Sequence, residues 1–150
     1  MSERKTAWVD PKSLKPDSRN PNIHSPEQID RLVLLIQNYG WRHPLIVSNQ
    51  TGLIVVGHGR LEAALKMGST VVPVEYQDFK DEDEAYGFMV ADNGIASWAH
   101  LDLGAISLNL ADMDPTFNLN LFGLKDFQVD AAEKKQKPPE ACPECGYVKQ

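Results

Sequence analysis

The apolar positions of the chain change between helical and extended spacing. Between residues 29 and 36, apolar side chains recur at i, i+3, i+4 and i+7, the spacing of a helix that buries one face. Ser25 is suited to cap this helix in front of Pro26, which fits the first helical position. We therefore predict an amphipathic helix that starts after Ser25 and that Gly40 ends in a left-handed conformation.

Short extended runs lie on both sides of this helix. Residues 44–47 and 53–56 are apolar and rich in β-branched side chains, and turn formers at 49–52 separate them. This pattern predicts a β-hairpin. Upstream, residues 8–17 mix Trp, Val and Leu with Pro and Lys, which indicates a short edge strand followed by a turn.

A helix and a further strand follow the hairpin. Helix formers fill residues 60–67, and Gly68 can end that helix. Residues 71–76 predict another strand, but Pro73 lacks the N–H group that a β-ladder requires. We therefore expect an edge position or a bulge at this strand.

The second half of the chain is predicted to be helical before it becomes polar. Acidic residues suit the start of a helix at about 81–95, and a second helix is predicted at 103–112. The expected organisation is a core at 8–79, a helical extension and docking tail at 80–129, a Lys- and Pro-rich linker at 130–139, and a CxxC knuckle at 140–150.

Composition and charge argue against some classes of function, namely coating of nucleic acid and insertion into a membrane. The 150 residues are 42% hydrophobic and 24% charged, with a formal net charge of −6. This balance is typical of a globular protein, and the negative charge argues against coating nucleic acid through bulk charge. The first ten residues lack a signal-peptide run, and the apolar run at 32–36 is too short for a bilayer. We expect a cytoplasmic protein with no membrane segment.

The turn between the second hairpin strand and the next helix carries candidate chemistry. Its residues are Gly57, His58, Gly59 and Arg60. A strand that ends in Gly-x-Gly and leads into a helix directs backbone N–H groups and the positive end of the helix dipole at one point, which suits phosphate. Arg60 adds a guanidinium that matches phosphate oxygens, and His58 can donate or accept a proton. The alternative is a tight turn without a ligand.

The order of elements resembles the ParB N-terminal domain family, which shares its fold with sulfiredoxin. The similar segments are DPKSLKPDSRNPNIHSPEQIDRLVLLIQNYGWRHPLIV, LIVVGHGRLEAALKMGSTVVPVEY and ADNGIASWAHLDL. The match runs from about Trp8 to Asp102 and is especially close to stand-alone ParB-like proteins of phages and of methyltransferase neighbourhoods. The resemblance implies an α+β fold with a small mixed sheet, helices packed on it, a helical extension and a flexible tail.

The resemblance also implies a nucleoside triphosphate ligand, which is CTP in partition ParB proteins and ATP in sulfiredoxin. The GHGR turn matches the triphosphate-binding turn of the family. Asp92 and Asn93 match an acidic-Asn pair that can help to hold Mg²⁺ against the phosphates. Arg19 and Asn20 fall near an early loop that faces the nucleotide. Without the resemblance, Asp92 and Asn93 would be read as a helix end and Arg19 as a solvated loop residue.

Several residues depart from the family pattern. Partition ParB proteins usually have Gly-Glu-Arg-Arg at the turn, where this chain has His58 and Gly59, so phosphate affinity is expected to be weaker or the nucleotide different. Ile95 and Ala96 stand where Gln and Arg are frequent, which puts a hydrolysis step in doubt. The turn has no cysteine, so sulfiredoxin chemistry is excluded.

Cys142 and Cys145 form a CPECG motif, which is half of a tetrahedral Zn²⁺ site. A second chain could supply the other ligands and give a zinc-linked homodimer. A flexible tail with free thiols is the alternative.

Three functions therefore remain open. The first is a nucleotide-binding module that works with DNA or with a DNA-modifying protein. The second is a nuclease or nucleotide hydrolase, with His58 as acid or base and Asp92 as a metal ligand. The third is a zinc-assembled adaptor with a degenerate pocket.

Overall fold

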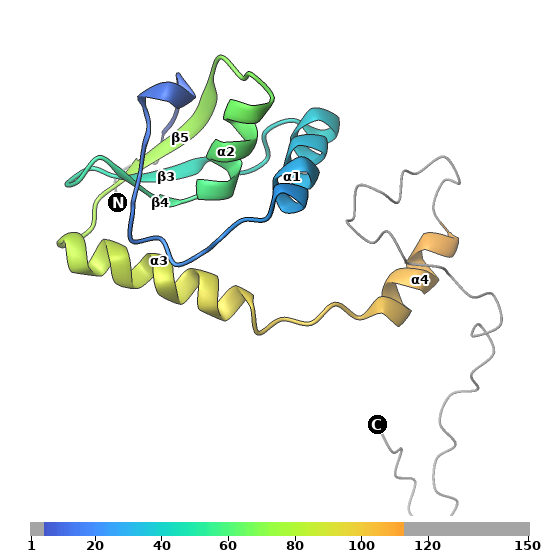
Figure 1. The fold of residues 1–150 in the computed structure, drawn as a ribbon. Helices are drawn as coiled ribbons and strands as arrows, with labels where there is room; N and C mark the ends of the chain where they lie inside the picture. The colour runs from blue at the N-terminus through green and yellow to red at the C-terminus, as the bar shows by residue number, and fades with distance from the viewer. Residues whose placement is uncertain (1–4, 113–150) are drawn as a thin grey trace, which may run out of the picture. The chain divides into compact units, whose positions relative to one another are not determined.

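The computed structural model describes residues 5–112 of the chain. Contacts divide the chain into two units, Met1–His100 and Leu101–Gln150. None of the described helices has the length and apolar character needed to cross a membrane. The candidate phosphate turn, Asp92 and Asn93 lie in the first unit, which is drawn from blue to yellow in Figure 1.

The first unit is built on a five-stranded mixed sheet in the order β1-β5-β3-β4-β2. Its strands are β1 (Thr6–Val9), β2 (Lys15–Pro16), β3 (Leu45–Ser48), β4 (Leu53–Val56) and β5 (Val72–Gln77). The β3–β4 and β1–β5 pairs are antiparallel, whereas the β3–β5 and β2–β4 pairs are parallel. The predicted hairpin and the predicted edge strand near Trp8 are confirmed.

The expected edge position of the Pro73 strand is wrong. β5 lies inside the sheet, between β1 and β3. Pro73 pairs with Trp8 of β1, but the ladder with β3 begins only at Val74. The proline therefore stands at a position where β5 has a neighbouring strand on one side alone, and the sheet tolerates its missing N–H.

Two helices cover one face of the sheet. These are α1 (Pro26–Tyr39) and α2 (His58–Lys66), and a short 3₁₀ turn, η1 (Pro11–Ser13), precedes β2. α2 packs directly on the sheet, and α1 packs against α2 through Ile29, Ile36 and Ala63. The main core consists of Leu45, Val47, Ile54, Leu61, Ala64, Val72 and Val74.

The opposite face of the sheet is partly covered by α3 (Glu82–Ala96) (Figure 1). Val55 of β4 packs against Ala85 and Met89 of this helix, and all three side chains are buried. The sequence analysis placed this helix in an extension beyond residue 79. In the structure it packs on the sheet and belongs to the same unit as the core. This packing fixes α3 beside the end of β4, where the predicted phosphate turn begins.

The second unit contributes one described helix, α4 (Leu103–Ala111), whose N-cap Asp102 accepts a hydrogen bond from the Ala105 N–H. The docking tail predicted up to residue 129, the linker at 130–139 and the CxxC knuckle at 140–150 lie outside the described residues.

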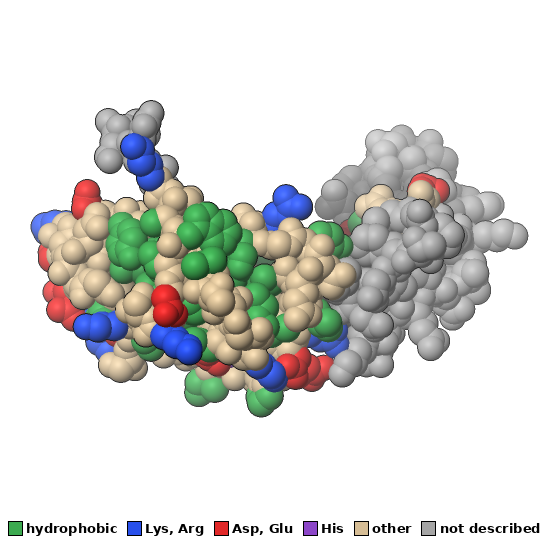
Figure 2. All heavy atoms as spheres, turned by 90° about the horizontal axis from the view of Figure 1, so that it is seen from above, with side chains coloured by type: hydrophobic (Ala, Val, Ile, Leu, Met, Phe, Trp, Pro, Cys, Tyr) green, Lys and Arg blue, Asp and Glu red, His purple; other side chains and the backbone are tan. Residues whose placement is uncertain are grey.

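Charges of both signs occur together on the described surface. Figure 2 shows Lys and Arg side chains interspersed with Asp and Glu around a hydrophobic area on the face seen from above. The described part of that face therefore presents no continuous basic surface of the kind that binds nucleic acid through its backbone.

The start of α1 offers a test of the local structure. Ser25 Oγ accepts a hydrogen bond from the Gln28 N–H at 3.1 Å, as the predicted N-cap requires. We expect Ser25→Ala to lower the free energy of unfolding by about 1 kcal/mol, measured by urea denaturation. Ser25→Asn keeps an acceptor and should lose much less. Equal losses in the two variants would show that the cap does not set this helix start.

Candidate functional site

The turn between β4 and α2 has a backbone suited to an anion. Gly57 is the N-cap residue of α2 and adopts a left-handed conformation, with φ +103° and ψ 24°. No side chain makes a capping hydrogen bond to the start of this helix. The predicted start of the helix at Arg60 is wrong, because α2 begins at His58. The amides of His58, Gly59 and Arg60 therefore lie in the first turn, where N–H groups have no acceptor within the helix. These donors and the helix dipole point toward the same place.

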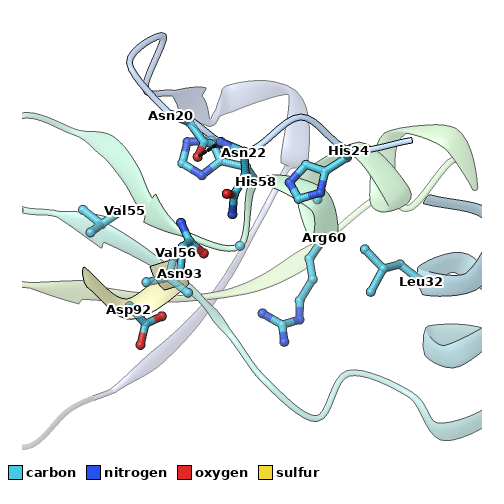
Figure 3. Close-up of a pocket in the computed structure, with 12 residues that line it drawn as sticks. Asn20, Asn22, His24, Leu32, Val55, Val56, His58, Arg60, Asp92 and Asn93 are labelled. Atoms are coloured by element: carbon cyan, nitrogen blue, oxygen red, sulfur yellow. Dashed lines mark hydrogen bonds between the residues drawn. The ribbon is translucent and has the colours of Figure 1, made fainter. Parts of the chain in front are cut away.

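A cavity of about 300 Å³ opens at this helix start. It is lined by Asn20, Asn22, His24, Leu32, Val55, Val56, Gly57, His58, Gly59, Arg60, Asp92 and Asn93. Figure 3 shows Arg60 extending from α2 between Leu32 on one side and Asp92 on the other. The structure thus brings together segments that the sequence separates by many residues, namely the loop before α1, the β4–α2 turn and the C-terminal part of α3.

Arg60 places a partly buried positive charge in this cavity. Its side chain is partly buried, and no hydrogen bond or ion pair joins it to another residue in the described part of the chain. Burial lowers the pKa of its guanidinium, although an arginine stays charged at any physiological pH. The guanidinium is partly shielded from water and has no partner among the described residues, so it is available to bind an anion in this cavity.

His58 is held by the loop that precedes α1. The backbone N–H of Asp17 donates to His58 Nε2 at 3.2 Å, and both side chains are 8% exposed. Burial lowers the pKa of the His58 imidazole, an effect that the nearby Asp17 carboxylate opposes. His58 therefore stands at the cavity as a buried imidazole whose Nε2 already has a partner.

The structure does not bring Arg19 into the cavity lining. Its guanidinium makes hydrogen bonds to Asp17 at 3.0 and 2.7 Å, an ion pair with Glu82 at 2.9 Å, and lies 4.9 Å from the centre of the Tyr86 ring. The hydrogen bond from Arg19 holds the pKa of the Asp17 carboxyl below its usual range. Arg19 thus fastens the loop to α3, and its neighbour Asn20 is the residue that reaches the cavity.

His24 and Asn22 line the cavity but were not among the residues predicted to bind phosphate. A Cβ placed on Gly59 would lie 3.1–3.2 Å from the His24 ring, so the ring packs directly over the helix start. His24 Nδ1 also lies 3.2 Å from Gln28 Oε1. A glycine at the second position of a helix carries an entropic cost, and this cost was the one signal in the sequence that a close neighbour covers Gly59.

The contact between His24 and Gly59 gives a quantitative test. Alanine in a helix is favoured over glycine by about 1 kcal/mol, but the added methyl group displaces the His24 ring. We expect Gly59→Ala to stabilise the protein clearly only when His24 is already alanine. A double-mutant cycle on the free energy of unfolding should show a coupling of about 0.5–1 kcal/mol. Additive effects would show that the ring does not rest on Gly59.

Asp92 and Asn93 are the described carboxylate and amide of α3 that line the cavity. Mg²⁺ accepts such oxygen donors and commonly completes its shell with phosphate oxygens and water. The described residues contain no group of three His, Cys, Asp or Glu side chains that could hold a metal. Asp92 and Asn93 offer two oxygen donors, so a Mg²⁺ ion held here would need phosphate oxygens and water to complete its shell. Cys142 and Cys145, the expected zinc ligands, lie outside the described residues.

A second cavity of about 380 Å³ shares Arg60 with the first. Its other lining residues come from the end of α1 and the segment before β3, and are Leu35, Ile36, Tyr39, Gly40, Trp41, Arg42 and His43. This cavity is more apolar than the first and includes two aromatic side chains.

A mixed sheet whose hairpin leads into a Gly-x-Gly-Arg helix start is the arrangement that the resemblance to ParB domains predicts. No family model matches the chain. The chain is 37% identical over 75 residues to the ParB-like nuclease domain-containing protein YnaK of Escherichia coli K12, covering 49% of this chain and 85% of YnaK. The chain therefore belongs to the ParB-like domain family.

Solved ParB structures share the fold. The C-terminally truncated Caulobacter crescentus ParB, complexed with CTP-γ-S, is similar with a TM-score of 0.59 and 21% identity over 70% of this chain. A Pnob8-like ParB-N domain gives a TM-score of 0.51 and 23% identity over 75% of this chain. The match spans 60% and 49% of those chains, respectively. The α+β fold of ParB type is thus confirmed.

Proposed function

We propose that this chain is a nucleotide-binding module of ParB type, which binds CTP or ATP with Mg²⁺ and acts in a DNA-related process such as regulation, partition or methylation. The observation that carries the proposal is Arg60, a partly buried guanidinium without a partner in the described chain, at the open N-terminus of α2. A phosphate group there would accept bonds from the first-turn amides and from the guanidinium fork.

The lining of the first cavity supports a polyphosphate rather than a carboxylate or sulfate. Asn20, Asn22 and Asn93 add amide groups that can donate to phosphate oxygens. Asp92 would repel a bare anion but becomes favourable when Mg²⁺ lies between carboxylate and phosphate. A divalent cation bound with the phosphates removes this repulsion, so we assign the cavity to a Mg²⁺-bound di- or triphosphate.

The second cavity supports a nucleotide rather than inorganic phosphate. Arg60 lines both cavities, so a ligand with its phosphates at α2 can extend past this side chain. Tyr39 and Trp41 then offer apolar and aromatic surface of the kind that accepts a base. The CTP-γ-S complex of Caulobacter ParB makes CTP the first nucleotide to test.

Isothermal titration calorimetry with CTP, ATP, GTP, UTP and cytidine, each with Mg²⁺, tests the proposal. We expect heat from at least one triphosphate, much weaker binding of the nucleoside, and loss of affinity when Mg²⁺ is removed. Silence from all four triphosphates at millimolar concentration would overturn the assignment of the cavity.

A nuclease or nucleotide hydrolase is the second candidate, because the printed name of YnaK includes a nuclease domain. Two features place it second. Among the described residues, Asp92 is the lone carboxylate that lines the first cavity, and His58 Nε2 already accepts a hydrogen bond. Mg²⁺- or Mn²⁺-dependent cleavage of single-stranded DNA that disappears in Asp92→Asn would place it first. Cleavage that persists in that variant would indicate a contaminating enzyme.

A further inference from the structure

The hydrogen bond between Asp17 and His58 fixes the chemical form of the imidazole. A backbone N–H can only donate, so His58 Nε2 must offer its lone pair to accept from Asp17 N at 3.2 Å. The proton of the neutral ring then sits on Nδ1. In the fold, this buried bond joins the first turn of α2 to a loop that is distant in sequence.

The bond also determines where the cavity loop lies. Asp17 Oδ1 accepts from the Arg19 N–H at 2.9 Å, and Asp17 O accepts from the Asn20 N–H at 3.1 Å. Asn20 Oδ1 in turn accepts from the Asn22 N–H at 3.2 Å. A chain of hydrogen bonds therefore runs from His58 to Asn20 and Asn22, two of the polar residues that line the anion cavity.

We propose that His58 is a positioning residue, which in its neutral Nδ1–H form holds the loop of residues 17–22 over the anion cavity through the Asp17 N–H. The identity of the ligand in this inference rests on the proposed function. The hydrogen bonds that hold the loop are independent of it. This positioning role differs from a role as general base through Nε2, because that nitrogen already accepts a hydrogen bond from the protein itself.

Protonation should release the loop. An imidazolium has a hydrogen on both nitrogens, so Nε2–H would face the Asp17 N–H and the bond would be lost. The groups that act on His58 are Asp17 from the loop, Glu62 from α2 and His24 from the segment before α1. Asp17 and Glu62 favour the charged ring, whereas burial and His24 oppose it. Burial is the largest of these effects, so the ring is neutral near pH 7.

The direction of the pH effect on folding follows from the lowered pKa of His58. The unfolded chain takes up this proton near its ordinary pKa of about 6.5, whereas the folded chain resists it. The contribution of the neutral ring to stability is therefore complete above about pH 6.5 and is lost as the pH falls toward the folded pKa. The Asp17 carboxyl, whose pKa is also lowered, titrates at more acid pH and does not share this window.

Two substitutions separate positioning from a direct role in binding. The Oε1 atom of a glutamine can lie near the place of Nε2 and accept from the Asp17 N–H at any pH, whereas an asparagine side chain is too short to reach it. We expect His58→Gln to keep nearly wild-type nucleotide affinity and His58→Asn to lose about tenfold, the value of one buried hydrogen bond. At acid pH, wild-type affinity should fall relative to His58→Gln. Equal affinities of the two variants, or a gain in wild-type affinity over His58→Gln, would overturn the proposal.

Two measurements on the ligand-free protein keep the inference independent of the proposed function. The ¹⁵N shifts of the His58 ring should show the Nδ1–H tautomer, and amide hydrogen exchange at Asp17 should be slow in wild type and His58→Gln but faster in His58→Asn. A ring protonated on Nε2 at neutral pH would refute the inference even if nucleotide binds. The expected tautomer without nucleotide binding would refute the proposed function alone.

Discussion

Arg60→Ala is expected to lower nucleotide affinity by at least about 100-fold, because it removes charge-assisted bonds worth about 3 kcal/mol. The same change should leave the free energy of unfolding unchanged or raise it. The guanidinium is partly buried, and no described residue pairs with it. The free protein therefore bears its desolvation cost without a compensating bond. Calorimetry and urea denaturation of the same preparation measure the two effects.

Two further variants separate charge from geometry at this position. Arg60→Met keeps most of the apolar stem and should give the more stable protein while still failing to bind. Lys66→Ala makes the same charge change on the same helix, but Lys66 is exposed and pairs with Asp30 outside the cavity, so binding should stay within about twofold. A large loss of stability in Arg60→Met would mean that the guanidinium has a structural partner. Arg60 would then not be available to bind an anion in the cavity.

Gly57→Ala is expected to destabilise the fold by about 2–5 kcal/mol, the sum of backbone strain and overpacking. The φ angle of +103° is a conformation that residues with a Cβ rarely adopt. The added Cβ would also lie 3.0 Å from Cγ of Leu45, a fully buried core residue. Relief of this close contact with Leu45 would require movement of the β4–α2 turn. Because the turn carries the proposed phosphate-binding amides, nucleotide affinity should fall together with stability.

Gly52 provides a matched control for this substitution. It also has a positive φ, +69°, but nothing lies within 4 Å of a Cβ built on it. Gly52→Ala should therefore show the backbone cost alone, on the order of 1 kcal/mol, and leave ligand binding intact. Equal unfolding free energies for the two variants would contradict the tight approach of the turn to the core.

Local signals account for the parts of the fold that were predicted correctly. Ser25 and Pro26 mark the start of α1 and Gly40 marks its end by their own chemistry, although Gly40, at φ 71° and ψ −175°, lies outside the predicted left-handed helical region. The two β-branched runs form a hairpin because their turn lies between them. The start of α2 was misplaced because no side chain caps it. The left-handed Gly57 precedes that helix as its N-cap. A backbone angle cannot be predicted from the spacing of apolar residues.

Long-range contacts account for what the sequence analysis missed at the site. His24 lines the cavity because it packs on Gly59. Arg19 does not line it, because Glu82 and Tyr86 hold its guanidinium. These partners are far apart in sequence, so residue type alone could not reveal them. The resemblance to ParB domains placed Asp92 and Asn93 near the turn, and in the structure both line the same cavity as Arg60.

The central claim is that the amides of the first turn of α2 and the Arg60 guanidinium hold the phosphates of a nucleotide. Two-dimensional ¹H–¹⁵N spectra during a titration with Mg²⁺ and CTP test this claim most directly. We expect the largest shifts at the amides of His58, Gly59 and Arg60 and at Arg60 Nε–H. Binding with its largest shifts on residues remote from this turn would contradict it.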